Sequence, residues 1–111
     1  MTRWIRITTE QSIPPREGRT VQLGGRSIAL FNTGSEFLAV DNRCPHGGGP
    51  LADGIVGGAT VTCPMHNWRI CLPTGNVTKP CDSAAPEVQT YRTKVEEGIV
   101  LLALDQAQAA A

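Results

Sequence analysis

Apolar and polar residues alternate along much of this chain over short stretches, a pattern typical of half-buried β-strands. Turn-forming residues such as Gly24 with Gly25, and Glu97 with Gly98, separate the stretches. Short strands at regular spacing with turn signals between them predict an all-β fold, an antiparallel sandwich or barrel. The predicted strands are residues 4–7, 20–23, 27–32, 37–41, 90–96 and 99–104.

The pattern changes between residues 42 and 72, where glycine and proline are dense and only 60–62 and 68–70 resemble short strands. This segment has few apolar residues, so we expect a bound metal to support its structure. Residues 78–87 contain two prolines, which predict a loop rather than a strand or helix. We therefore expect one domain over 1–111, with a framework at about 4–41 and 73–104 and a small inserted subdomain at about 42–72.

Cysteine and histidine occur together twice in that segment, as Cys44-Pro45-His46 and as Cys63-Pro64-Met65-His66. Two thiolates and two imidazoles make a four-ligand metal site. Tetrahedral zinc also accepts this set, but zinc sites more often pair Cys with Cys and His with His at short spacing. Here each pair is mixed, which favours a centre in which each loop supplies one thiolate and one imidazole.

The spacing C-x-H, sixteen residues, C-x-x-H resembles the signature of the Rieske [2Fe–2S] family. The resemblance covers about residues 4–104 and implies an antiparallel β fold with an inserted cluster-binding subdomain. It also implies that Cys44 and Cys63 bind one iron of the cluster, and that His46 and His66 bind the other and lie near the surface. Such a protein transfers single electrons.

Within that family, the run from Cys63 to Gly75 (CPMHNWRICLPTG) resembles the small subunit of NAD(P)H-dependent assimilatory nitrite reductase. The first loop, from Cys44 (CPHGGGPLADGIV), is similar to that subunit too. The resemblance implies a large partner subunit that carries flavin, a [4Fe–4S] cluster and sirohaem and reduces nitrite to ammonia. Two alternatives are a stand-alone ferredoxin of an aromatic-ring dioxygenase, which differs mainly at residues 67–69, and a structural zinc-binding interaction module.

Two departures from the high-potential Rieske branch predict a low reduction potential. Gly49 and Met65 stand where that branch has an extra cysteine in each loop, so its disulfide cannot form. The residues after His66, from 67 to 70, include no hydroxyl that could donate to cluster sulfur. Fewer hydrogen bonds stabilise the added electron less, so we expect a potential toward the lower end of the Rieske range.

Composition excludes several function classes. Ten basic and ten acidic residues cancel in this chain of 111 residues, so a nucleic-acid partner or an anionic membrane is not expected. No apolar run resembles a signal peptide or a membrane span, which predicts a soluble cytoplasmic protein. No G-x-G-x-x-G motif or acid–base pair gives this chain a complete active site of its own. We expect Cys71 and Cys81 to be buried apolar side chains rather than a disulfide.

Overall fold

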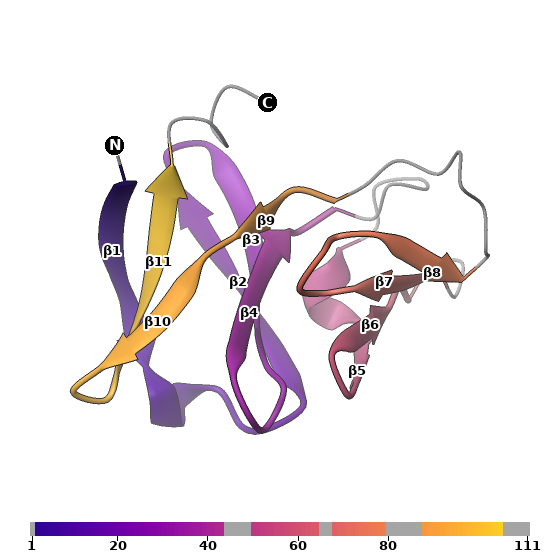
Figure 1. Ribbon diagram of the computed structural model, residues 1–111, viewed down its shortest axis with the longest axis horizontal. Coiled ribbons are helices and arrows are strands. Elements are labelled where there is room, and N and C mark those ends of the chain that lie inside the picture. Colours follow the sequence, from indigo (N-terminus) through magenta and orange to yellow (C-terminus); the bar gives the residue numbers. More distant parts are fainter. Residues whose placement is uncertain (1, 44–49, 65–67, 80–87, 106–111) are drawn as a thin grey trace.

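A computed structural model describes residues 2–43, 50–64, 68–79 and 88–105 of the chain (Figure 1). The strands in these ranges form three sheets in which every pairing is antiparallel. Helical structure there is limited to two single turns, η1 (Glu10–Ser12) and η2 (Leu51–Asp53). None of the described helices has the length and apolar character needed to span a bilayer. The predicted all-β antiparallel fold is confirmed.

The first sheet joins the beginning and the end of the described chain. Strand β1 (Thr2–Thr9) pairs with β11 (Ile99–Asp105), and β11 pairs with β10 (Thr93–Glu96). Glu97 and Gly98 connect β10 to β11 with φ angles of 52° and 78°. Positive φ at both residues gives the turn a twist that matches the twist of the flanking strands. The strands predicted at 4–7 and 99–104 are therefore present.

The second sheet has the order β2-β3-β4-β9, with bounds Glu17–Leu23, Arg26–Asn32, Phe37–Asp41 and Thr90–Tyr91. Leu23 pairs with Arg26, so Gly24 and Gly25 form the predicted two-residue turn. Their φ angles of 54° and 85° are readily adopted by glycine, which has no Cβ. The predictions of strands at 20–23, 27–32 and 37–41 are confirmed.

The third sheet is small and has the order β5-β6-β7-β8. Each of its strands has three residues, and their bounds are Ile55–Gly57, Thr60–Thr62, Arg69–Cys71 and Val77–Lys79. Strands near 60–62 and 68–70 were predicted. The other two strands were not, and Thr78 and Lys79 lie in β8 rather than in the predicted loop.

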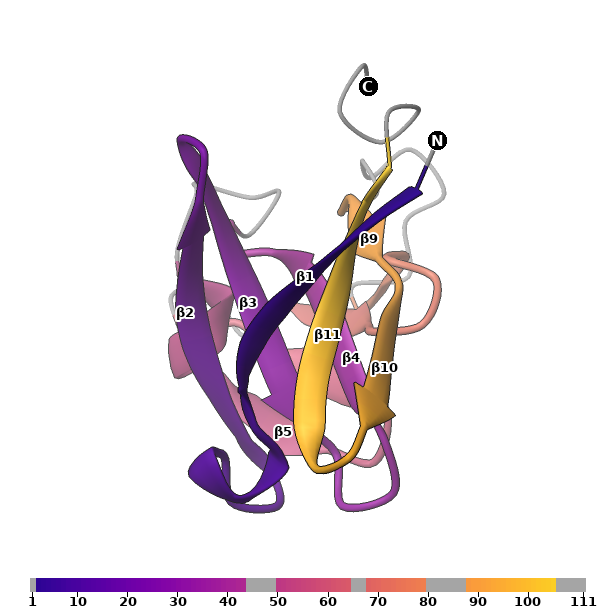
Figure 2. The ribbon, with the colours of Figure 1, turned by 90° about the vertical axis from the view of Figure 1, so that its left-hand side faces the viewer.

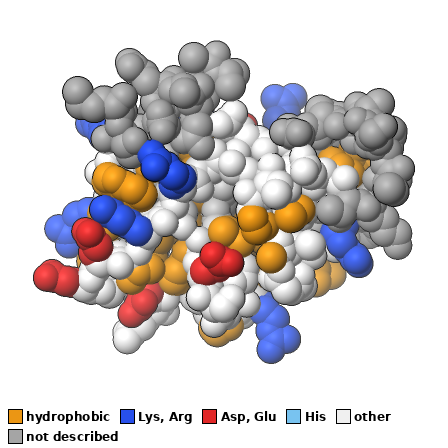
Figure 3. Space-filling view, in the orientation of Figure 1, with side chains coloured by type: hydrophobic (Ala, Val, Ile, Leu, Met, Phe, Trp, Pro, Cys, Tyr) orange, Lys and Arg blue, Asp and Glu red, His pale blue; other side chains and the backbone are white. Residues whose placement is uncertain are grey.

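The second sheet is the middle layer, with the first sheet on one side and the third on the other (Figures 1 and 2). Strand β3 is buried on both faces for this reason. Ile28 and Leu30 belong to the core that includes Val100 of the first sheet, whereas Phe31 belongs to the core that includes Ile70 of the third. Charged side chains of both signs are interspersed over the surface in Figure 3, in keeping with the net charge of zero.

The predicted strand at 90–96 is two strands in different sheets. Thr90 and Tyr91 pair with β4 of the second sheet, and Thr93 begins the pairing with β11 of the first. The chain changes sheets at Arg92, whose carbonyl accepts a hydrogen bond from the Ala103 N–H at 2.9 Å. Continuous alternation in the sequence cannot reveal a change of pairing partner, which is why the break was missed.

Candidate metal centre

The second predicted ligand segment begins at the end of β6 in the third sheet. Cys63 directly follows β6, and its backbone N–H donates to the Trp68 carbonyl at 2.7 Å. Because Thr62 pairs with Arg69, Cys63 and Trp68 lie side by side at the adjoining ends of β6 and β7. His66, the other predicted ligand here, lies outside the described residues.

Cys63 has the chemistry that a ligand needs. Its side chain is fully buried within the core between the second and third sheets, and its thiol forms no disulfide. Trp68 is partly buried and packs against the same core. A buried free thiol at a strand end suits either a core position or a thiolate ligand to iron.

The first predicted ligand segment begins where β4 ends. Cys44 and His46 lie outside the described residues, but both ends of their segment are described. Asn42 follows β4, and its side-chain Oδ1 accepts the backbone N–H of Ala52 in η2 at 2.7 Å. This bond holds the two ends of the segment together.

The two segments also approach each other. A Cβ built on Gly54, which follows η2, would lie 2.4 Å from the Thr62 carbonyl oxygen and 2.8 Å from Val61 Cγ2. Only glycine allows this contact, and the next residue, Ile55, pairs with Thr62. The end of the first segment therefore lies against the strand that leads into Cys63.

The structure brings these anchor points together, while the full ligand set stays a prediction. Three of the four proposed ligands lie outside the described residues. Among the residues that are described, no group of three or more His, Cys, Asp or Glu side chains could hold a metal ion. Cys71 is half-buried and forms no disulfide, and Cys81 lies outside the described ranges.

A part-buried hydrogen-bonded group at the end of β4 was not anticipated from the sequence. The Tyr91 hydroxyl donates to Asp41 Oδ1 at 2.6 Å and accepts a hydrogen bond from the Arg26 guanidinium at 3.0 Å. Burial raises the pKa of Tyr91, and the bond to Asp41 raises this pKa further, against the opposing effect of Arg26. The group fixes β9 to β4 next to the first ligand segment. A tyrosine on a predicted strand gave no signal of it.

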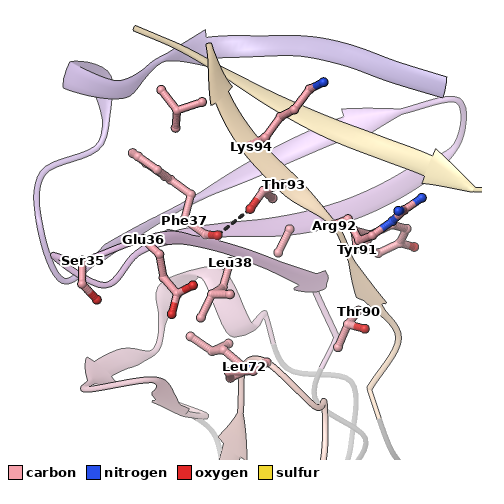
Figure 4. Close-up of a pocket in the computed structure, with 13 residues that line it drawn as sticks. Ser35, Glu36, Phe37, Leu38, Leu72, Thr90, Tyr91, Arg92, Thr93 and Lys94 are labelled. Carbon is pink, nitrogen blue, oxygen red and sulfur yellow. Dashed lines mark hydrogen bonds between the residues drawn. The ribbon is translucent and has the colours of Figure 1, made fainter. Parts of the chain in front are cut away.

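A surface groove lies between the second sheet and strand β10. It has a volume of about 540 Å³ and lies between β4, β10 and the turn after β7 (Figure 4). Leu38 and Leu72 line it, and the Thr93 hydroxyl donates to the Phe37 carbonyl at its side. Among the residues that the structure describes, no cysteine or histidine lines the groove.

The comparisons with known proteins identify a family. The sequence profile of the Rieske [2Fe–2S] domain matches residues 3–92 of this chain, which confirms the resemblance carried by the C-x-H and C-x-x-H pairs. The ferredoxin component of the naphthalene 1,2-dioxygenase/salicylate 5-hydroxylase systems from Ralstonia sp. is 31% identical over 102 residues, 92% of this chain and 96% of that protein. The ferredoxin subunit of 3-phenylpropionate/cinnamic acid dioxygenase from Escherichia coli K12 is 42% identical over 82 residues, 73% of this chain and 76% of that protein.

Two solved structures are similar over nearly the whole chain. A structure described as a putative NADH-dependent nitrite reductase small subunit from Mycobacterium tuberculosis has a TM-score of 0.83 and 26% identity, and the match covers 95% of this chain and 97% of that one. A chain in the complex of reduced oxygenase and oxidized ferredoxin of carbazole 1,9a-dioxygenase has a TM-score of 0.80 and 26% identity, with 90% and 92% covered. The neighbours thus include both kinds of redox system.

Proposed function

The chain belongs to the Rieske [2Fe–2S] family, and we propose that it is the small electron-transfer subunit of an NAD(P)H-dependent nitrite reductase. Family membership implies a Rieske-type [2Fe–2S] cluster and makes the chain an electron-transfer protein of an oxidoreductase system. Within the proposal, Cys44 and Cys63 bind one iron and His46 and His66 bind the other. The cluster supplies one-electron redox chemistry when bound.

The proposed ligand set fits the described anchors. Cys63 offers a buried thiol at a strand end, and the Asn42–Ala52 hydrogen bond closes the base of the segment that contains Cys44 and His46. Gly54, beyond the end of the first segment, packs against Val61 and Thr62, which lead into Cys63. This contact supports a cluster bound by two thiolates and two imidazoles from separate loops. In the proposal the chain is one domain, and its third sheet with the flanking segments forms the cluster-binding part.

The residues after His66 are the main reason for proposing a nitrite reductase partner rather than a dioxygenase. Asn67-Trp68-Arg69 resembles the nitrite reductase small subunit and differs from the His-Gly-x-x-Phe usual in other Rieske ferredoxins. Trp68 packs against the core, whereas the Arg69 side chain is exposed on β7, one residue beyond it. The similarity to the Mycobacterium tuberculosis small subunit over 95% of this chain supports the same choice.

The large subunit implied by this resemblance carries flavin, a [4Fe–4S] cluster and sirohaem, and reduces nitrite to ammonia. The proposed role of this chain is to relay electrons within that complex. Such a complex draws its electrons from NAD(P)H, so the proposal includes a cytoplasmic location.

A second candidate is a ferredoxin that delivers electrons to an aromatic-ring dioxygenase. The specific observation in its favour is the 42% identity to the dioxygenase ferredoxin subunit from Escherichia coli K12, a higher identity than that of the nitrite reductase neighbour. The family match makes the third alternative, a zinc-binding interaction module, the weakest of the three.

The two candidates differ in the acceptor, and reconstitution separates them. The purified chain with its cluster is added to a nitrite reductase large subunit, and NAD(P)H-dependent ammonia formation is measured. In parallel it is added to an aromatic-ring oxygenase with its reductase, and hydroxylated product is measured. We expect stimulation of ammonia formation only. Stimulation of the oxygenase alone would overturn the proposal in favour of the second candidate.

A control variant addresses the role of the cluster within the complex. Cys63→Ser replaces a proposed thiolate ligand and should prevent cluster assembly. If the chain relays electrons, this variant should bind the large subunit without stimulating it. Equal stimulation by the variant would mean that the chain acts as a structural partner instead.

A further inference from the structure

Asn42 lies in the segment that follows β4, and its side chain forms hydrogen bonds with several separate parts of the chain. Its Nδ2 donates to the Thr20 hydroxyl at 3.1 Å and to the Ser27 hydroxyl at 3.2 Å. Its Oδ1 accepts the Ala52 N–H at 2.7 Å. One carboxamide therefore joins the β2–β3 hairpin to η2, which is distant from it in sequence.

These bonds lie at both ends of the segment with Cys44 and His46. Asn42 comes two residues before Cys44, and Ala52 is the residue that the segment leads into after Pro50 and Leu51. Ala52 is buried, so its N–H would have no water to replace the lost carboxamide oxygen. Leaving a buried donor unsatisfied is destabilising. The bond to Asn42 is thus a strong constraint on where the segment begins and ends.

The backbone of Asn42 is held as well. Its N–H donates to the Ser27 carbonyl at 2.9 Å, which extends the β3–β4 contact by one residue past Asp41. Asp41 is fixed in turn by the Tyr91 hydroxyl. The residue from which the first ligand segment departs is therefore immobilised through its side chain, its backbone and its neighbour.

We propose that Asn42 is a positioning residue for the cluster, fixing both ends of the first ligand segment against the β2–β3 hairpin so that Cys44 and His46 bind in one geometry. The inference rests on the proposed ligand set and is independent of which partner accepts the electron. Groups outside the first coordination shell that orient metal ligands commonly affect metal affinity by about 10–100-fold.

The groups that hydrogen-bond to the Asn42 side chain allow a conservative substitution at this position. Hydroxyl groups can donate or accept, so Thr20 and Ser27 could reverse their bonds and donate to a carboxylate. In Asn42→Asp one carboxylate oxygen could still accept the Ala52 N–H. This variant keeps the constraint, whereas Asn42→Ala removes it.

Asn32 provides a matched control at the other end of β3. Its Nδ2 donates to the Ile13 carbonyl at 2.7 Å, and its Oδ1 accepts the Gly34 N–H at 2.8 Å. It is half-buried like Asn42 and uses the same donor and acceptor, but it constrains the turns beside β2 and β4, at the opposite end of β3 from Ser27. Asn32→Ala should cost comparable stability without touching the cluster.

The test uses the purified full chain with its cluster and two readouts, the rate of iron loss to a chelator and the electron paramagnetic resonance spectrum of the reduced form. We expect Asn42→Ala to lose iron about tenfold faster than the wild type. Its g values should shift as well. Asn42→Asp should restore the wild-type spectrum, and Asn32→Ala should match the wild type in both readouts.

The results that would contradict this proposal alone differ from those that would also contradict the ligand set. Asn42→Ala with wild-type g values, or with the same iron loss as Asn32→Ala, would overturn the proposal alone. A wild type without a rhombic Rieske signal would overturn the ligand set and this proposal together. If Asn42→Ala does not fold, the double variant Thr20→Val with Ser27→Ala takes its place. An unchanged iron-loss rate in that variant would equally refute the proposal.

Discussion

The first and third sheets both pack against the second, but the paired strands β1 and β11 of the first sheet are much longer than the strands of the third. Strands β1 and β11 have eight and seven residues and pair along nearly their whole length. Each strand of the third sheet has three residues. Short strands with a small apolar face are marginal by themselves. We therefore expect the third sheet, which leads into Cys63, to depend on the second sheet and on the proposed metal centre far more than the first sheet does.

The largest expected effect comes from removing a proposed ligand. His66→Ala should abolish cluster binding, because three ligands cannot hold both irons, and iron and acid-labile sulfide analysis would measure the loss. Without the cluster, amide exchange should accelerate in β5 to β8 while β1 and β11 keep their protection. A purified His66→Ala protein with full iron and sulfide would contradict the ligand set.

Core substitutions on the two faces of β3 should separate the two regions next. Phe31→Ala removes the largest side chain of the core shared with the third sheet and should cost about 3–5 kcal/mol of unfolding free energy. Leu30→Ala, on the opposite face, should cost about 2–5 kcal/mol. Urea unfolding measures both values.

Hydrogen exchange then tests where each of these variants opens. Phe31→Ala should raise exchange first in β6 and β7, and Leu30→Ala should raise it first in β11. The same exchange pattern in both variants would show that the layers open as one unit.

A smaller difference is expected between the stability costs of Gly→Ala substitutions at two glycines with positive φ. Gly75 has φ 79°, and a Cβ there would lie 2.0 Å from the Val88 carbonyl oxygen, whereas a Cβ on Gly24, with φ 54°, would contact nothing within 4 Å. Gly24→Ala should cost about 1–2 kcal/mol for the left-handed backbone alone. Gly75→Ala should cost about 1–3 kcal/mol more, because Val88 must move. Equal losses in thermal unfolding would show that the contact of Gly75 with Val88 is easily relieved.

Substitution of Tyr91 should have the smallest of these effects on stability, and the size of the effect should depend on pH. Its pKa is raised above 10.0 in the folded state, so the folded chain holds this proton more tightly than the unfolded chain does. Its contribution to stability is therefore full below pH 10 and is lost as the pH rises through the folded pKa. Tyr91→Phe should cost about 1–2 kcal/mol at neutral pH and weaken the alkaline decline.

The measurement is simple because Tyr91 is the only tyrosine in the chain. Tyrosinate absorbance during an alkaline titration reports this residue alone, and urea unfolding at several pH values gives the stability. A folded-state titration at or below pH 10 would contradict the part-buried hydrogen-bonded group around Asp41.

Features that depend on residues close together in the sequence could be predicted. Gly24-Gly25 between alternating stretches predicted the β2–β3 hairpin, and the mixed Cys/His pairs predicted the family. The change of sheet at Arg92 and the three-residue strands β5 and β8 left no such pattern. The role of Asn42 could not be inferred, because Thr20, Ser27 and Ala52 meet it only in the folded chain.

The mixed Cys/His ligation is best tested by the electron paramagnetic resonance spectrum of the dithionite-reduced protein, measured together with its iron content. We expect two irons per chain and a rhombic signal whose average g value lies below that of an all-cysteine cluster, as two imidazole ligands require. A silent spectrum, or a signal with the average g value of an all-cysteine cluster, would contradict the assignment of His46 and His66.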